Sequence, residues 1–399
     1  MAKIVLTHFN LTTESGDPKM LLSIAQGLKK LGHTVTIYCA EFDPEACFPR
    51  LNQGLDVRVA PPPKPLSSVR GAIGLLAKIL ERIKQARLYH DAAQRIAVQL
   101  KKDLDFVIVE NDYTYKAAAA HKKENPKAKT VWIMNNPPFF HSKKRNFTLD
   151  ILSRVANLFE KWSAKKYAKY IDWIVVYDEN FRRLAGTLGR PVKVLRNPVD
   201  VDYFFAPPKR GIRAGEKIQL LSLGALSPNR RFEDTISAVK ILRDKGYNAG
   251  AVIICKDYWG NKQYRESFEN FIKNSGVAGY VDARFQGASE EEYLDAIRTS
   301  DVFILPNNIK NWAVGAFEAM AAGVPLVVSR ATAVSEILHD GKDALFVDVL
   351  RPDEIAEKVE FLAKDAGLYV RIASAGQELV IKDMSLNNFA KKILEPPQA

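Results

Sequence analysis

The chain has 399 residues, of which 47% are hydrophobic and 26% are charged. This composition is typical of a globular protein and excludes disordered and collagen-like chains, and the length favours two α/β-sized domains with a cleft between them. The net charge of +12 is uneven, because residues 1–200 carry 33 basic and 19 acidic residues. The first half is therefore expected to attract a polyanionic partner.

The cysteines and the hydropathy of the chain indicate the cellular compartment in which the protein is expected. Cys39, Cys47 and Cys255 follow no paired or metal-ligand spacing, so the sequence predicts neither a disulfide framework nor a zinc site. The first residues, MAKIVLTHF, form a short apolar run without a cleavage site. No apolar stretch approaches the roughly 20 residues of a membrane span. We expect a cytoplasmic protein that is neither secreted nor integral to a membrane.

The first half alternates between strand-like and helix-like segments. A β-like run at 3–8 is followed by a polar loop, a helix-period stretch from about Lys19 to Leu31 and a second run at 33–39. Further short runs rich in Val and Ile lie at 55–60, 105–111, 130–135 and 172–178. Short apolar runs separated by helices predict a buried parallel sheet.

The pattern starts again in the second half. Its predicted strands lie at 218–226, 249–255, 281–287, 301–306, 325–329 and 344–348. With helices between them they predict a second Rossmann-like unit, joined through the basic, Pro-rich stretch 202–215. We expect one domain at 1–204, completed by a C-terminal helix at 385–399, and the other at 205–384.

The segment Pro306–Gly341, PNNIKNWAVGAFEAMAAGVPLVVSRATAVSEILHDG, reads as strand, loop, helix, turn, strand, loop and helix. Glu318 opens the second turn of the first of these helices. Backbone amides at that helix start are free donors beside the positive end of a dipole, which suits a diphosphate. An ordinary βαβ unit without a ligand explains the spacing equally well.

The same segment resembles a known family. FEAMAAGVPLVVS followed by SEILHDGKDALFVD is similar to the donor domain of family 4, the large family of retaining GT-B glycosyltransferases. Three further segments resemble that family in the same order: SGDPKMLLSIAQGLKKLGHTVTIYC, VLRNPVDVDYF and LSLGALSPNRRFED. The resemblance implies an α/β protein of the GT-B class, with two doubly wound Rossmann-like domains facing a central cleft. It assigns the acceptor to the N-terminal domain and the nucleotide-sugar donor to the C-terminal one.

Donor-binding residues follow from the resemblance, residue by residue. Glu318 is implied to bond the nucleotide ribose, and Arg230, with Arg231 as a second candidate, to pair with the diphosphate. Gly16 would let the first loop approach the phosphates. The remaining implied donor contacts are Phe285 and Gly287 near the nucleobase and Ala313, Val314 and Gly315 at the helix start.

The chain also departs from the family pattern. Lys310 stands where the family usually has Glu, Ala225 where it usually has Arg, and Asn111 where it often has His. Asn111, Asp112, His141 and Lys310 remain the catalytic candidates. Asp112 could accept a proton, although a loop carboxylate or a helix cap is the ordinary interpretation of an aspartate there. The ordinary interpretation of His141 is an exposed loop histidine.

We expect neither a metal nor a cofactor, because the nucleotide-sugar is a substrate. DVD at 200–202 imitates a metal motif of another glycosyltransferase fold, but it lies inside the segment that resembles the domain crossing. Arg230 and the helix-end amides would neutralise the leaving diphosphate instead.

Two basic amphipathic stretches remain, at 68–86 and 147–170. The second places Ile151, Val155, Leu158, Phe159 and Trp162 on one face, with Arg154, Lys161, Lys165, Lys166 and Lys169 around them. Either stretch is explained by a helix that packs on a core. The functional alternative is peripheral association with an anionic membrane at its inner face.

The predicted function is transfer of a hexosyl unit from a UDP- or GDP-sugar to a lipid-linked or glycan acceptor, with retention and without metal. A non-catalytic GT-B homologue is an alternative. A nucleotide-sugar epimerase or a dehydrogenase is disfavoured because no Gly-X-Gly-X-X-Gly fingerprint follows the first strand. A nucleic-acid partner is not expected, since no recognition motif accompanies the basic charge.

Overall fold

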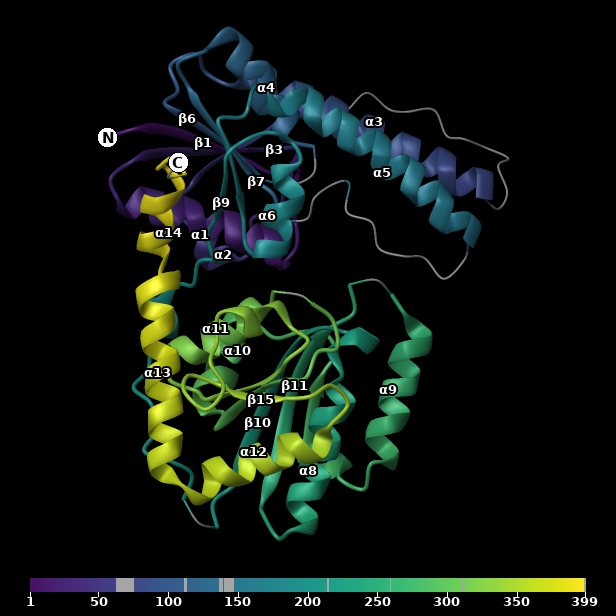
Figure 1. Ribbon diagram of the computed structural model, residues 1–399, viewed down its shortest axis with the longest axis vertical. Helices are drawn as coiled ribbons and strands as arrows, with labels where there is room; N and C mark the ends of the chain where they lie inside the picture. Colours follow the sequence, from purple (N-terminus) through teal and green to yellow (C-terminus); the bar gives the residue numbers. More distant parts are fainter. Residues whose placement is uncertain are drawn as a thin grey trace. The chain divides into compact units, whose positions relative to one another are not determined.

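The computed structural model describes residues 1–61, 75–110, 113–135, 139, 147–213, 215–258, 260–310 and 312–397. The chain forms two compact units, unit 1 from Met1–Pro198 with Leu386–Ala399 and unit 2 from Val199–Ser385 (Figure 1). Each unit has its own parallel sheet and its own hydrophobic core. The two Rossmann-like domains predicted from the sequence are therefore confirmed.

Unit 1 is built on a seven-stranded sheet in the order β5-β3-β1-β6-β7-β8-β9, with each neighbouring pair parallel. The strands are β1 (Lys3–Thr7), β3 (Thr34–Cys39), β5 (Asp56–Val59), β6 (Phe106–Glu110), β7 (Lys129–Ile133), β8 (Trp173–Val176) and β9 (Val192–Val194). A separate short pair joins β2 (Asn10–Leu11) to β4 (Glu41–Phe42). The Val- and Ile-rich central strands are buried on both faces because helices cover the sheet on both sides.

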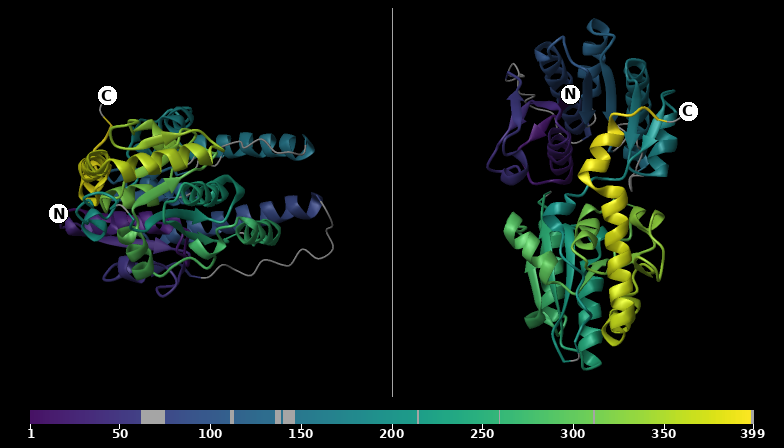
Figure 2. Two further views of the ribbon diagram at one scale, coloured as in Figure 1. Left: turned by 90° about the horizontal axis from the view of Figure 1, so that it is seen from below. Right: turned by 90° about the vertical axis from the view of Figure 1, so that its left-hand side faces the viewer.

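Helices divide between the two faces of the unit 1 sheet (Figure 2). One face packs against α1 (Gly16–Lys30), α2 (Pro49–Asn52) and α14 (Leu386–Ile393). The other packs against α3 (Leu75–Gln99), α4 (Tyr115–Glu124), α5 (Phe147–Ala168) and α6 (Glu179–Gly186). The C-terminal helix expected at 385–399 is thus present as Leu386–Ile393 and completes the core of unit 1.

Unit 2 contains a six-stranded parallel sheet in the order β12-β11-β10-β13-β14-β15. The strands are β10 (Ile218–Ala225), β11 (Ala249–Lys256), β12 (Val281–Arg284), β13 (Val302–Leu305), β14 (Leu326–Ser329) and β15 (Leu345–Val347). Numbered along the chain, this order is 3-2-1-4-5-6, which is that of a Rossmann sheet.

The helices of unit 2 also divide between two faces. One core cluster joins the sheet to α8 (Phe232–Asp244), α9 (Lys262–Asn274) and α12 (Pro352–Lys364). The other joins it to α7 (Val201–Phe204), α10 (Glu290–Thr299) and α11 (Val314–Ala321), and α13 (Ala366–Met384) reaches both clusters. Short 3-10 turns are η1 (Pro228–Arg230), η2 (Ala278–Tyr280) and η3 (Ala333–Glu336).

Local sequence signals explain where several helices begin. Ser289 and Glu292 form a reciprocal capping box at the start of α10. Side-chain oxygens of Asp178, Asn261 and Asp365 accept amide hydrogen bonds at the starts of α6, α9 and α13. Each cap satisfies an amide that has no intrahelical acceptor, and one such cap contributes about 1 kcal/mol.

The boundary between the units lies before α7, whereas the sequence placed it after residue 204. Val199 donates its amide to the carbonyl of Met384 at 2.8 Å, and Phe204 packs into the core of unit 2. The four residues of α7 are therefore part of unit 2. The predicted strands of both halves are present within one or two residues of their expected ends, except that β12 ends at Arg284, three residues before the expected 287. The strands β2, β4 and β9 are additional.

All three cysteines are free and buried. Burial raises the pKa of the Cys39 and Cys255 thiols to about 12 and that of Cys47 to about 11. At neutral pH these groups are protonated and act as small apolar packing residues.

Candidate functional site

The clearest candidate site in unit 2 lies at the switch point of its sheet. The chain leaves β10 toward α8 on one face and leaves the adjacent β13 toward α11 on the other. Ligands of doubly wound sheets bind outside the carboxyl ends of the strands at such a point. The two loops touch there, because the amide of Asn308 donates to the carbonyl of Asn229 at 3.1 Å.

Arg230 lies against the end of β10. A Cβ atom at Gly224 would stand only 3.0 Å from Nε of Arg230, and Gly224 has a φ of +154°. A glycine is therefore needed where the guanidinium approaches the strand. Burial lowers the pKa of Arg230, but a guanidinium remains charged in proteins. The strand end thus carries a partly desolvated cation.

Arg231 has a different role. It adopts a left-handed conformation with φ +55° as the residue before α8. Its guanidinium binds Asp234, with Nη2 at 2.5 Å from one carboxylate oxygen and Nε at 3.1 Å from the other. This pairing raises the pKa of Arg231. Of the two predicted diphosphate ligands, Arg230 is the one whose guanidinium lies at the end of β10.

The loop after β13 leads into α11, whose start matches the predicted diphosphate contacts. Ala313 is the N-cap residue, no side chain caps it, and the first turn holds no acidic residue. A Cβ atom at Gly315 would lie 3.2 Å from the Tyr293 hydroxyl and 3.3 Å from Leu223. Gly315 thus lets the helix start, with Val314, lie close to the sheet, and the first-turn amides suit an anion.

Glu318 is buried one turn further along α11, with 2% of its surface exposed. The Tyr293 hydroxyl in α10 donates to Oε2 of Glu318 at 2.5 Å. Burial, reinforced by the Glu318 charge, raises the pKa of Tyr293 well above its ordinary value. The phenol therefore keeps its proton and orients the carboxylate.

Lys310 forms an ion pair with Glu336, at 2.5 Å between Nζ and Oε1. Glu336 belongs to η3, which follows β14. The pair therefore ties the loop after β13 to the loop after β14. The cation that replaces the usual family glutamate is thus matched by a nearby carboxylate.

The two predicted nucleobase neighbours lie beyond β12. Phe285 packs on the core, 6.0 Å from Phe268 between ring centroids, and the Arg265 guanidinium lies 4.8 Å from its ring. Gly287 has a φ of +86° beside Lys256. These residues lie at the same carboxyl edge of the sheet as Arg230. Arg230 follows β10, whereas Phe285 and Gly287 follow β12, two strands away in the sheet.

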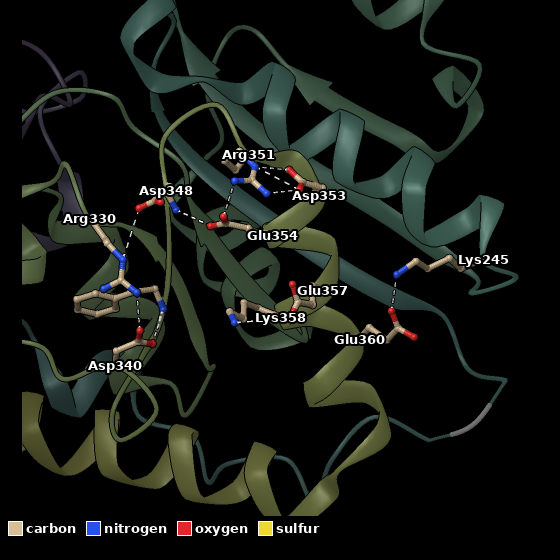
Figure 3. A network of polar contacts seen from close by, with 11 residues as sticks. Lys245, Arg330, Asp340, Asp348, Arg351, Asp353, Glu354, Glu357, Lys358 and Glu360 are labelled. Atoms are coloured by element: carbon tan, nitrogen blue, oxygen red, sulfur yellow. Dashed lines mark hydrogen bonds and ion pairs between the residues drawn. The ribbon is translucent and has the colours of Figure 1, made fainter.

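A polar network supports the opposite side of this edge (Figure 3). Arg330, directly after β14, pairs with Asp340 at 2.7 Å and with Asp348 at 3.5 Å. Arg351, before α12, pairs with Asp353 and Glu354. These charges are about half exposed, so each pair contributes at most about 1 kcal/mol. The network fixes loop geometry more than it stabilises the fold.

In unit 1 the corresponding switch point lies between β1 and β6. Gly16 is the first residue of α1, and a Cβ atom there would meet nothing within 4 Å. Packing therefore does not require this glycine, and open space remains beside the helix start. Asn111, Asp112 and His141, predicted as catalytic candidates, lie outside the described residues.

A buried polar cluster at the same edge was missed by the sequence analysis. Asn135 Nδ2 donates to Glu110 Oε1 at 2.6 Å and to Asp17 Oδ1 at 3.1 Å. Burial and the neighbouring Asp17 raise the pKa of Glu110 well above its ordinary value, and burial also raises the pKa of Asp17. Among the described residues, Glu110 Oε2 and Asn135 Oδ1 have no hydrogen-bond partner. The available signal was a polar residue at or just beyond the end of a buried strand, since Glu110 ends β6 and Asn135 lies two residues after β7.

Within the described ranges, no group of three or more His, Cys, Asp or Glu side chains is arranged to hold a metal ion. Asp200 is the N-cap residue of α7, and Asp202 lies in the first turn of that helix. Among the helices that the structure describes, none is long and apolar enough to cross a membrane.

Two family models match the chain. The model "Glycosyltransferase Family 4" matches residues 16–203, and the model "Glycosyl transferases group 1" matches residues 207–379. Together they span both units.

Several named glycosyltransferases are similar to part of this chain. The GDP-mannose-dependent alpha-(1-6)-phosphatidylinositol monomannoside mannosyltransferase of Mycobacterium tuberculosis is 26% identical over 53% of this chain. The match covers 58% of that protein, so the chain spans little more than half its length. The lipopolysaccharide core biosynthesis glycosyltransferase LpsE of Rhizobium meliloti is 27% identical over 66% of this chain and 73% of its own.

The fold is shared with solved structures. The crystal structure of Anabaena Alr3699/HepE in complex with UDP-glucose aligns with a TM-score of 0.71 over 98% of both chains, at 14% identity. At that identity the likeness establishes the GT-B fold alone.

Proposed function

The chain belongs to glycosyltransferase family 4, and on that premise we propose that it transfers a hexosyl unit from a UDP- or GDP-sugar to a lipid-linked or glycan acceptor. The observation that carries the proposal is the arrangement at the switch point of unit 2. A partly desolvated Arg230 and the uncapped start of α11 occur there, with the buried Glu318 one turn along that helix.

These groups match the parts of a nucleoside diphosphate. The Arg230 guanidinium and the amides at 313–315 suit the diphosphate, because both are donors in a positive local field. The Glu318 carboxylate, oriented by Tyr293, accepts hydrogen bonds as ribose hydroxyls would require. Lys310, held by Glu336, is assigned to the transferred sugar.

The transfer step needs a stabilised leaving group. We infer that Arg230 and the α11 amides neutralise the departing diphosphate without a metal ion, by preorganised electrostatics. We propose that the anomeric configuration is retained, because the sequence resembles a retaining family. In that mechanism the acceptor hydroxyl attacks the anomeric carbon from the face that the diphosphate leaves, and a donor phosphate oxygen takes the acceptor proton.

The acceptor is assigned to unit 1. Support comes from the polar switch point of that unit, where Gly16 leaves open space and where Glu110, Asn135 and Asp17 gather. A lipid-linked class is favoured by the mycobacterial relative, a GDP-mannose-dependent phosphatidylinositol monomannoside mannosyltransferase.

A thermal-shift screen tests the proposal directly. The full chain is heated with UDP, GDP, ADP and their sugars, each well above its dissociation constant. Ligand at about 100 times that constant adds roughly 2.7 kcal/mol to the stability of the native state, so one base series should raise the Tm clearly. The same donor should then give a glycosylated acceptor detectable by mass spectrometry. Absence of a shift with every nucleotide-sugar would contradict the proposal, and a shift without transfer to any acceptor would favour a non-catalytic homologue.

A further inference from the structure

Helix α5 packs on unit 1 through its small side chains. Ser163, Ala164 and Ala168 are buried, and the half-buried Tyr167 joins the same core cluster. The apolar face containing Leu158 was expected to be the packing face if α5 were a core helix. The structure places a different, small-residue face against the sheet.

Three large apolar side chains consequently face solvent. Leu158, Phe159 and Trp162 are 68%, 65% and 61% exposed. The rings of Phe159 and Trp162 are 5.9 Å apart, so the three side chains form one patch rather than scattered contacts. Single exposed apolar residues are common on protein surfaces, whereas a contiguous group of large ones usually marks a binding surface.

The same face is basic. Lys165, Lys166 and Lys169 are exposed, and Lys166 Nζ lies 5.7 Å from the Trp162 ring. Leu158, Trp162, Lys165 and Lys169 follow at helical spacings of four, three and four, which places them along one stripe. The acidic Glu160 is bonded by the Tyr113 hydroxyl at 3.2 Å on another side of the helix.

The helix is also placed to present this face. In both Figure 1 and Figure 2, α5 extends away from the unit 1 sheet. An extended helix with exposed aromatic groups can reach a flat surface without rearrangement of the core.

We propose that the α5 surface, made of Leu158, Phe159, Trp162, Lys165, Lys166 and Lys169, docks the protein on an anionic lipid bilayer. Trp and Phe favour the boundary between headgroups and acyl chains, and lysines gain from anionic headgroups. A second copy of the chain is a poorer occupant, because pairing two such faces would bring like charges together. This inference concerns unit 1 and extends the proposed function, whereas the donor residues belong to unit 2.

Charge variants of the full chain test the basic part of the surface. The parent should sediment with vesicles of phosphatidylglycerol and phosphatidylcholine, weakly with phosphatidylcholine alone, and less as salt rises. Lys165→Gln/Lys166→Gln should weaken binding to anionic vesicles by roughly 25-fold at low salt, since each cation near such a surface contributes about fivefold. The matched control is Lys391→Gln/Lys392→Gln, an exposed pair in the last turn of α14 on the opposite face of the same sheet. The control should bind like the parent.

Aromatic variants test insertion. On anionic vesicles the tryptophan emission should shift to shorter wavelength, and Trp162→Phe should remove that shift while keeping vesicle binding. Phe159→Ser/Trp162→Ser should lose most binding at high salt, with an unchanged circular dichroism spectrum. Equal sedimentation of the α5 and α14 lysine variants would overturn the proposal. So would a dimer in sedimentation velocity that Trp162→Ser dissociates. Nucleotide binding is measured separately, so a failure here is distinct from a failure of the proposed transfer activity.

Discussion

Replacing Glu110 by Gln probes the buried polar cluster of unit 1. Glu110 is fully buried, and its pKa is raised well above the ordinary value of 4.5, first by burial and then by Asp17. Gln has nearly the shape of a protonated Glu, and its carbonyl oxygen can still accept the 2.6 Å hydrogen bond from Asn135. The variant therefore removes the ionisation and keeps the contact.

The sign of the pH effect follows from linkage. Above pH 4.5 the unfolded chain loses the Glu110 proton while the native state keeps it, so the parent loses stability as pH rises. The loss is about 1.4 kcal/mol for every pH unit over which only the native state holds the proton. Glu110→Gln should therefore match the parent near pH 4 and become increasingly more stable than the parent above pH 4.5, by at most about 3.4 kcal/mol at pH 7.

Urea denaturation at a series of pH values measures this difference. His8 acts in the opposite direction. Burial lowers its pKa to about 4, so between about pH 4 and its ordinary pKa of 6.5 only the unfolded chain holds the proton, and the stability of the native state rises with pH. The difference between variant and parent cancels this shared contribution. Glu45→Gln, at an exposed position in the same unit, is the control and should show no pH-dependent difference. A Glu110→Gln variant that is no more stable than the parent at pH 7, with the same m-value, would refute the reasoning.

Three further predictions concern unit 2 and the reaction. Gly224→Ala should cost about 1 kcal/mol of stability and weaken nucleotide binding, because its Cβ would displace Arg230. Denaturation measures the stability and calorimetry the affinity, and an unchanged affinity would contradict this prediction. Lys310→Met should change stability by less than about 1 kcal/mol, since the ion pair with Glu336 is half exposed. The variant should lower the transfer rate but leave the affinity for UDP or GDP unchanged. An unaltered transfer rate would show that Lys310 is not part of the site. A chelator should leave transfer unaltered in a product assay, whereas activity that returns only with added divalent ion would contradict metal-independent leaving-group stabilisation.

Sequence patterns predicted the sheets because the buried strands are short runs of Val and Ile between helical segments. The strand β9 was not predicted because it has only three residues, all half-buried, and lacks a strongly apolar pattern. The structure divides the units before α7 and not at 204, because Phe204 packs on unit 2, a long-range contact that local periodicity does not encode.

The candidate site residues differ in how far local sequence patterns indicate them. The residues that cluster at one switch point, Arg230 and the start of α11, were indicated by family-like motifs. The Glu110, Asn135 and Asp17 cluster joins residues more than a hundred positions apart, so no local motif marks it. The α5 surface shows a related limit, because helical periodicity identifies an apolar face but not whether another element covers it.

Isothermal titration of the full chain with UDP and with GDP tests the central claim most directly. One of the two should bind, and Arg230→Ala should weaken that binding by about 1.5 to 3 kcal/mol, roughly 10- to 150-fold, as expected for lost charge-assisted hydrogen bonds. Arg213→Ala, which removes an arginine with 85% of its side chain exposed in the same unit, should leave the affinity unchanged. No binding of either nucleotide, or equal affinity of parent and Arg230→Ala with native circular dichroism, would contradict a donor site at the switch point of unit 2.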